Sequence, residues 1–204
     1  MLAMKRAKAA WQDRRRLFAR VLVVVLMVVA ALQLSSGLYI QLKAVLAQHL
    51  IAHSWQQSLQ QGGAAVKPWR WADTWPVARL QFPEHKVDLY VLEGSEGNSL
   101  AFGPGHMTAS SAVGEGGTSV IAGHRDTHFH FFRNIVIGDQ VQVTDKHGVV
   151  HYYRVERAEI VDSREATIGL NADVDQLLMV TCFPFDGINI TTLRYQLVAK
   201  PVTT

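Results

Sequence analysis

Cys182 is the only cysteine in the chain and the first candidate for chemistry. It ends the apolar run 177–181 and precedes Phe183-Pro184, where the proline interrupts regular strand pairing. A cysteine at a strand end faces a loop and is open to substrate, although a core position is the commonest fate of a free thiol. A lone cysteine cannot form an internal disulfide, so in an oxidising compartment it must be buried or used.

A histidine that can serve this thiol follows a second apolar run. Residues 120–123 are strand-like and lead directly into His124. A free thiol has a pKa of about 8.5 and is mostly neutral at pH 7, so a nucleophilic cysteine needs a partner. A neighbouring histidine can support the thiolate and later protonate a leaving amine. Alone, His124 is one of nine histidines, and only its place at a strand end marks it.

Arg194 supplies a fixed cation within a third strand-like run, residues 192–198. It follows Cys182 by 12 residues, with the turn residues Asp186-Gly187 between them, so a hairpin would set the two on neighbouring strands. A cation there can hold the oxyanion that forms when a thiolate attacks a carbonyl. Arginine suits this role because it stays charged and presents several donors.

Five further residues have both a functional and a plainer interpretation. Thr181 is expected to support the site through hydroxyl or backbone contacts, and Asp126 either holds the histidine loop or caps a turn. His106 either lines a groove or is an ordinary surface or core residue. Phe183 and Phe185 either form a wall for an apolar substrate residue or close the barrel end.

Three histidines, at 124, 128 and 130, have spacing that suggests a metal site. No carboxylate or cysteine nearby completes a clear ligand set. We therefore predict no metal and no other cofactor.

The elements that must position these residues are short strands. Gly, Pro, Asn, Asp and Ser separate the apolar runs, and few helical stretches interrupt them, which favours a closed β-barrel. Short helices are expected at 128–136 and 171–175. The predicted strands are 77–82, 87–93, 118–123, 139–144, 149–162, 177–182 and 192–202.

The N-terminal part of this 204-residue chain has a different character. Residues 1–20 hold seven basic residues and one acid, leaving 13 basic and 16 acidic residues, a net charge of −3, in 21–204. The basic character thus belongs to the tail and does not indicate nucleic-acid binding. Residues 21–40 carry no charge, and about 20 helical residues span the roughly 30 Å of a bilayer's apolar core.

These features predict a basic tail over 1–20 and a transmembrane helix over 21–40, with the N-terminus in the cytoplasm. A cleaved signal peptide is the alternative, but the apolar run is long and no clear A-x-A site follows it. Residues 41–76 are expected to form a helical stalk, ended by Gly62-Gly63, and a lead-in rich in Trp and Pro. The lead-in packs on the domain or lies at the membrane interface, and residues 77–204 form the barrel.

Together these residues resemble the sortase family. The resemblance lies in Leu178-Met179-Val180-Thr181-Cys182 against the family's T-L-x-T-C signature, Gly123-His124-Arg125 and Leu193-Arg194-Tyr195. Leu178 and Met179 depart from the signature, and we expect them to alter packing rather than chemistry. The similarity covers about residues 77–202, and the segment PWRWADTWPVARL at 68–80 resembles the Gram-negative branch of the family.

The resemblance implies an eight-stranded β-barrel and a cysteine transpeptidase. Cys182 would be the nucleophile, His124 the general acid/base and Arg194 the oxyanion stabiliser. The implied partners are a secreted protein with an LPxTG-like C-terminal sorting signal, an amine acceptor in the envelope and the cytoplasmic membrane. The implied location is the inner membrane, with the catalytic domain in the periplasm.

Two other functions remain open at this point. A cysteine endopeptidase would only hydrolyse, since water and an amine compete for the same thioester. A non-enzymatic envelope β-barrel that binds a peptide or a metal would not need Cys182.

Overall fold

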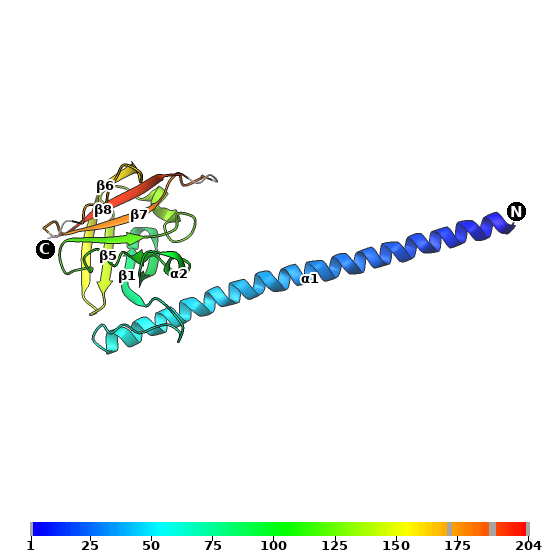
Figure 1. Cartoon of the computed structure of the whole chain (residues 1–204), viewed down its shortest axis with the longest axis horizontal. Helices are drawn as coiled ribbons and strands as arrows, with labels where there is room; N and C mark the ends of the chain where they lie inside the picture. The colour runs from blue at the N-terminus through cyan, green and yellow to red at the C-terminus, as the bar shows by residue number, and fades with distance from the viewer. Residues whose placement is uncertain (1, 171–172, 188–190, 203–204) are drawn as a thin grey trace. The chain divides into compact units, whose positions relative to one another are not determined.

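A computed structural model describes residues 2–170, 173–187 and 191–202, and the chain divides into two compact units, Met1–Leu46 and Ala47–Thr204. One helix, α1 (Leu2–Gln60), begins in the first unit and ends in the second (Figure 1). Its sequence contains no proline, so no backbone donor of the helix ladder is missing along its length. The helix ends before Gly62 and Gly63, whose φ angles of 67° and 89° are left-handed and favour glycine.

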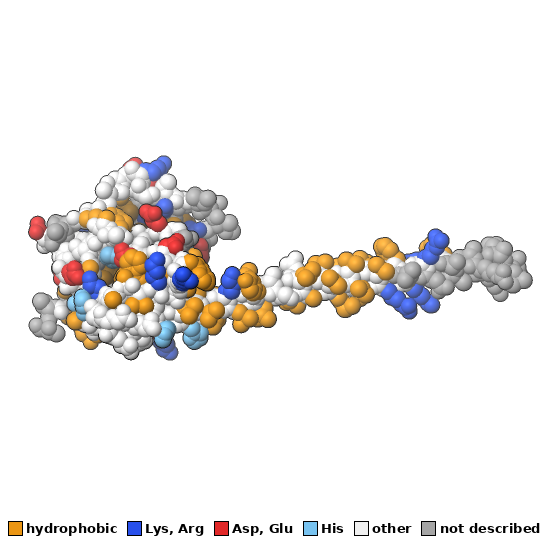
Figure 2. Space-filling view, turned by 60° about the horizontal axis from the view of Figure 1, so that its bottom comes forward, with side chains coloured by type: hydrophobic (Ala, Val, Ile, Leu, Met, Phe, Trp, Pro, Cys, Tyr) orange, Lys and Arg blue, Asp and Glu red, His pale blue; other side chains and the backbone are white. Residues whose placement is uncertain are grey.

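In the first unit, α1 exposes an apolar surface. Its large apolar side chains between Val21 and Ile40 are about half to three-quarters exposed. Figure 2 shows this apolar stretch with basic side chains on its N-terminal side. Within the described residues, α1 is the one helix long and apolar enough to cross a membrane. An uncovered surface of this kind is stable in lipid and costly in water.

In the second unit, the last turns of α1 pack against the rest of the domain. Ile51 and Trp55 are 1% exposed, and the Trp55 ring lies 6.3 Å from that of Tyr90. Gln48 donates from Nε2 to the carbonyl of Phe102 at 2.7 Å. The helix expected over 41–61 is therefore present, and its C-terminal part is an element of the domain.

The strands form a closed barrel in the order β1-β2-β3-β4-β7-β8-β6-β5. This confirms the predicted eight-stranded barrel, in which every strand has a hydrogen-bonded strand on each side. The strands are β1 (Pro76–Phe82), β2 (Val87–Glu93), β3 (Gly105–His106), β4 (Thr118–Ala122), β5 (Gln140–Asp145), β6 (Val150–Asp162), β7 (Gln176–Cys182) and β8 (Leu193–Pro201). The short helices are η1 (Pro83–His85), α2 (Gly97–Leu100) and η2 (His130–Asn134).

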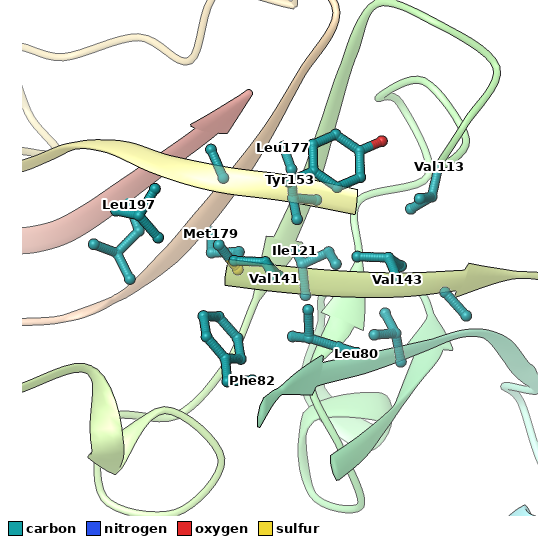
Figure 3. Packing of buried hydrophobic residues seen from close by; sticks show 14 of the residues in the cluster. Leu80, Phe82, Val113, Ile121, Val141, Val143, Tyr153, Leu177, Met179 and Leu197 are labelled. Atoms are coloured by element: carbon teal, nitrogen blue, oxygen red, sulfur yellow. The ribbon is translucent and has the colours of Figure 1, made fainter. Parts of the chain in front are cut away.

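The barrel interior is filled by alternate residues of the strands. In β1, buried and half-buried positions alternate strictly, as a strand with one face on the core requires. Figure 3 shows the inward side chains of several strands meeting in this core. Those that the figure labels and that are buried include Leu80, Phe82, Ile121, Val141, Val143, Tyr153, Leu177, Met179 and Leu197.

Strand β7 is buried on both faces over its middle. Met179 points into the main core, and Leu178 packs with Val120 and Val198 in a second apolar cluster. Two covered faces explain the continuous apolar run before Cys182. Leu178 and Met179, which depart from the sortase signature, thus both serve packing.

The seven predicted strands agree with the structure to within about a residue at each end. The short helices η1 and α2 were not predicted, and three further elements differ. Strand β3 was missed, because Gly105-His106 lies within a run that reads as a turn. The helix expected over 128–136 is the 3₁₀ helix η2, in which Phe132 is the buried residue. In the helical turn expected at 171–175, residues 171–172 lie outside the described residues, and 173–175 form a turn and bend rather than helix.

Candidate active site

Cys182 and Arg194 are paired residues of the β7–β8 ladder. Directly opposite residues of an antiparallel pair project to the same face, so the two side chains share one side of the sheet. Both residues are half-buried, and Cys182 is a free thiol. The hairpin expected from the 12-residue spacing is therefore present, and it places a cation beside the thiol.

His124 reaches this end of the barrel because β4 runs parallel to β7. Ala122 pairs with Val180, and the next amide, of Gly123, donates to the Val180 carbonyl at 3.1 Å. The hydroxyl of Thr181 donates to the Gly123 carbonyl at 2.7 Å. These bonds join the residue before His124 to the two residues before Cys182. Thr181 thus makes the hydroxyl contact expected of it, and His124 is exposed.

A buried pair of aromatic rings packs against the loop that carries His124. The Phe129 amide donates to the His124 carbonyl at 3.0 Å, which closes the loop over residues 124–129. Phe129 is fully buried and stacks on Phe132, with ring centroids 4.2 Å apart. A Cβ at Gly123 would lie 2.7 Å from the Phe129 ring, so only glycine allows this close approach.

A second histidine, His128, stacks against His124. The ring centroids are 6.3 Å apart and the planes are 28° apart. Nδ1 of His128 is buried with no hydrogen-bond partner among the described residues. Burial lowers the pKa of His128 below the ordinary 6.5, and the charge of His124 lowers it further. His128 is therefore a neutral neighbour of His124 at pH 7.

Asp126 contacts an arginine. Its Oδ1 accepts from Nε of Arg125 at 3.3 Å, and its side chain is 72% exposed. Arg125 in turn donates to backbone carbonyls of the segment that follows Cys182. Any hold of Asp126 on the histidine loop would thus act through Arg125.

An aromatic cluster lies beside the thiol. Phe185 and Phe183 meet at 5.7 Å, and each contacts Tyr195, at 5.0 and 6.3 Å. Tyr195 continues the contact to Phe132 at 6.5 Å, and Phe185 packs against the main core. Burial raises the pKa of Tyr195, so its hydroxyl stays neutral at physiological pH. Phe183 and Phe185 are half-buried, which suits a substrate wall and closure of the barrel end equally.

The guanidinium of Arg194 is oriented by its own hairpin. Nη1 donates to the carbonyls of Thr191 and Leu193, at 3.0 and 2.9 Å. These two bonds occupy one nitrogen, and a guanidinium carries five N–H donors. The backbone of the hairpin thus sets the orientation of the guanidinium, and among the described residues Nε and Nη2 make no hydrogen bond.

The structure does not bring His106 to this site. It lies on β3, where it pairs with Ile121, and Ile121 in turn pairs with Met179, three residues before Cys182. It is 7% exposed, and its Nε2 lies 3.0 Å from the Ser111 carbonyl. It lines a cavity of about 90 Å³ together with Glu93 and Asp145, which end β2 and β5.

No group of three or more His, Cys, Asp and Glu in the described ranges has the arrangement of a metal site. His124 and His128 meet ring to ring, and His130 is exposed. Sequence reasoning missed the roles of His128 and Arg125. The one available signal was that both residues lie within five residues of His124. That closeness in sequence does not predict which groups they contact in the folded chain.

The comparisons with known proteins agree with this geometry. The family model described as the sortase domain matches residues 80–202. Sortase D of Bacillus subtilis (strain 168) is 31% identical over 125 residues, which cover 61% of this chain and 63% of that protein. The match thus spans less than two-thirds of that relative.

Solved structures share the fold. A sortase D5 transpeptidase of Clostridium perfringens superposes with a TM-score of 0.61 at 19% identity, over 78% of this chain and 99% of that one. Sortase A of Corynebacterium diphtheriae gives 0.58 at 19% identity, over 78% and 85% of the two chains. Since the sortase model matches more than half of the chain and falls on the barrel that carries Cys182, His124 and Arg194, this protein belongs to the sortase family.

Proposed function

We propose that this protein is a membrane-anchored cysteine transpeptidase of the Gram-negative branch of the sortases, with Cys182 as nucleophile, His124 as general acid/base and Arg194 as oxyanion stabiliser. The observation that carries the proposal is the pairing of Cys182 with Arg194 across β7 and β8, with Gly123, next to His124, bonded to the same strand. Thr181 supports the site through its bond to Gly123, and Asp126 acts through Arg125.

The substrate is a secreted protein with an LPxTG-like C-terminal sorting signal. The Cys182 thiolate attacks the carbonyl carbon of the threonine, and the carbonyl electron pair moves to the oxygen, which Arg194 stabilises. When the C=O bond reforms, the C–N bond breaks and His124 protonates the leaving amine. The product is a thioester on Cys182.

An amine of the envelope then attacks the thioester and gives its proton to His124, and the Cys182 thiolate leaves. Water in place of the amine gives hydrolysis, so the same site can act as an endopeptidase. We assign Phe183 and Phe185 to contact an apolar residue of the signal. The chemistry needs no metal or organic cofactor, because the nucleophile, acid and oxyanion donor are all side chains.

The first prediction tests this function with the full chain in detergent. Intact-protein mass spectrometry after mixing with an LPxTG-like peptide should show an acyl adduct on Cys182, released faster when an amine is added. Cys182→Ala should give no adduct, and Cys182→Ser should turn over poorly because a hydroxyl is a weaker nucleophile at neutral pH. His124→Ala should nearly abolish turnover, and Arg194→Ala should lower it about 10²–10³-fold.

Three results separate the alternatives. Release of the adduct at one rate with and without amine would identify a hydrolase. Rate against pH should be bell-shaped, since thiolate and protonated imidazole are both required. Absence of an adduct with every sorting-type peptide, together with full function of Cys182→Ala, would leave the non-enzymatic binding module.

A further inference from the structure

The guanidinium of Arg125 lies between the loop that carries His124 and the segment that follows Cys182. Nη1 donates to the Pro184 carbonyl at 2.8 Å, and Nη2 donates to the Gly187 carbonyl. The side chain is 13% exposed. Arg125 directly follows His124, and Pro184 lies two residues after Cys182, so one side chain joins the neighbours of both groups.

The carbonyls, and not an ion pair, hold this cation in place. The Asp126 carboxylate is 72% exposed and accepts from Nε at 3.3 Å, and water screens an ion pair whose carboxylate is this exposed, so the pair contributes little. Removing a guanidinium from water is costly unless its donors are satisfied. The two carbonyls accept from both terminal nitrogens of the planar guanidinium. They must lie at a fixed separation to do so.

The geometry of the turn at 184–187 fits the guanidinium of Arg125. The Gly187 amide donates to the Pro184 carbonyl at 3.2 Å, so that oxygen accepts from both the turn and Arg125. A Cβ at Gly187 would lie 2.8 Å from Pro184 Cγ and 3.1 Å from Nη1 of Arg125. Glycine therefore allows the turn and the guanidinium to approach each other.

A second arginine contacts the same segment more weakly. Arg133 of η2 donates from Nη2 to the Phe185 carbonyl at 3.2 Å, and its guanidinium lies 5.9 Å from the Phe185 ring. Arg133 is exposed and Arg125 is not, so we assign the main role to Arg125. Carbonyl groups of the segment after Cys182 thus accept from Arg125 and Arg133, and both arginines lie in the segment that begins at His124.

We propose that Arg125 is a positioning residue that sets the placement of His124 relative to Cys182 by clamping the 184–187 turn. The proposal rests on the proposed function, in which proton transfer and attack share these two side chains. The backbone bond of Gly123 and the hydroxyl bond of Thr181 fix the strand ends, and Arg125 fixes the two loops beyond them. Displacing a catalytic group by about 1 Å can cost about 10²-fold in rate.

The experiment compares Arg125→Ala and Arg125→Lys with the parent in the full chain. We expect kcat to fall about 10–100-fold in both with little change in KM, because the reacting groups are misplaced while the binding surface is kept. Lysine keeps the charge but cannot donate to two separated carbonyls as a planar fork. Arg157→Ala, at an exposed arginine of β6 that pairs with Glu159, is the matched control and should leave kcat unchanged.

A substitution in the turn that Arg125 contacts gives an independent test. Gly187→Ala pushes a methyl group onto Pro184 and Arg125, so it should lower kcat by a similar factor. The Arg125→Ala/Gly187→Ala double variant should be much less than additive, since both changes disturb one contact. Thermal unfolding of all variants separates this effect from a general loss of folding.

Alkylation of Cys182 by iodoacetamide against pH gives a readout that needs no substrate. We expect both Arg125 variants to shift this profile, and amide hydrogen exchange of residues 185–187 to speed up. Recovery of the parent kcat and profile by Arg125→Lys would show that charge alone matters and would overturn the clamp, as would additive loss in the double variant. If the parent chain forms no acyl adduct, the proposed function fails, and an unchanged alkylation profile with unchanged exchange would then refute the clamp separately.

Discussion

At the residue scale, the candidate site brings together groups with different environments. Cys182 and Arg194 are half-buried on paired strands, and His124 is exposed at the start of a loop. The stacked neighbour His128 is partly buried and lacks a partner at Nδ1 among the described atoms. A neutral His128 adds no positive charge beside His124.

The pH dependence of stability follows from His128. Its folded-state pKa lies below 6.5, so the unfolded chain takes up the proton first. Stability should therefore fall as the pH drops through 6.5 and toward the lower folded pKa. His128→Phe keeps an aromatic ring and removes the titrating group, so its thermal midpoint should decline less between pH 7.5 and 5.5.

His130→Phe, at an exposed histidine of η2, is the control and should follow the parent. Titration of the histidine ring protons by NMR measures the pKa of His128 in the folded chain directly. A midpoint for His128 at or above 6.5 would contradict the burial argument.

At the element scale, the end of α1 is part of the catalytic domain. Trp55 is 1% exposed and contacts Tyr90 of β2. Ser58 donates to the Ala64 carbonyl at 2.7 Å, and Ser54 donates to the Val66 carbonyl, so the chain after the helix is tied back along it. A fragment that starts after Gly63 would lose this packing.

Trp55→Ala should lower the free energy of unfolding by about 3–5 kcal/mol, the usual cost of deleting a large buried aromatic ring. Chemical denaturation of the full chain in detergent measures it. Trp71→Ala is the matched control, because Trp71 is 79% exposed and its loss should change stability by less than about 0.5 kcal/mol. Equal stability of the two variants would mean that the helix end is not an element of the domain.

At the scale of the whole molecule, the apolar part of α1 suggests a membrane anchor. The basic residues of 1–20 and the uncharged residues of 21–40 are the basis for proposing that its N-terminus lies in the cytoplasm. The catalytic domain would then lie on the outer side of the inner membrane, where secreted proteins with sorting signals pass.

A membrane-impermeant thiol reagent applied to spheroplasts tests this orientation. In a Cys182→Ala background, Glu96→Cys should be labelled in intact spheroplasts, because Glu96 is exposed in the domain. Ala3→Cys in the same background should be labelled only after permeabilisation. The reverse pattern would place the domain in the cytoplasm and contradict the proposed location.

The sequence by itself predicted seven of the eight strands and the candidate residues, because both depend on local pattern, and the many short strands favoured a barrel. Alternation and turn residues marked seven strands, and the strand ends marked Cys182 and His124. It did not mark β3, whose two residues, Gly105-His106, are held by pairing with β2 and β4 rather than by their own propensity. The contact between His124 and His128, the clamp of Arg125 and the distance of His106 from the site were decided by tertiary structure alone. Each joins or separates segments according to which strands are neighbours, and strand order in a barrel is a property of the whole chain.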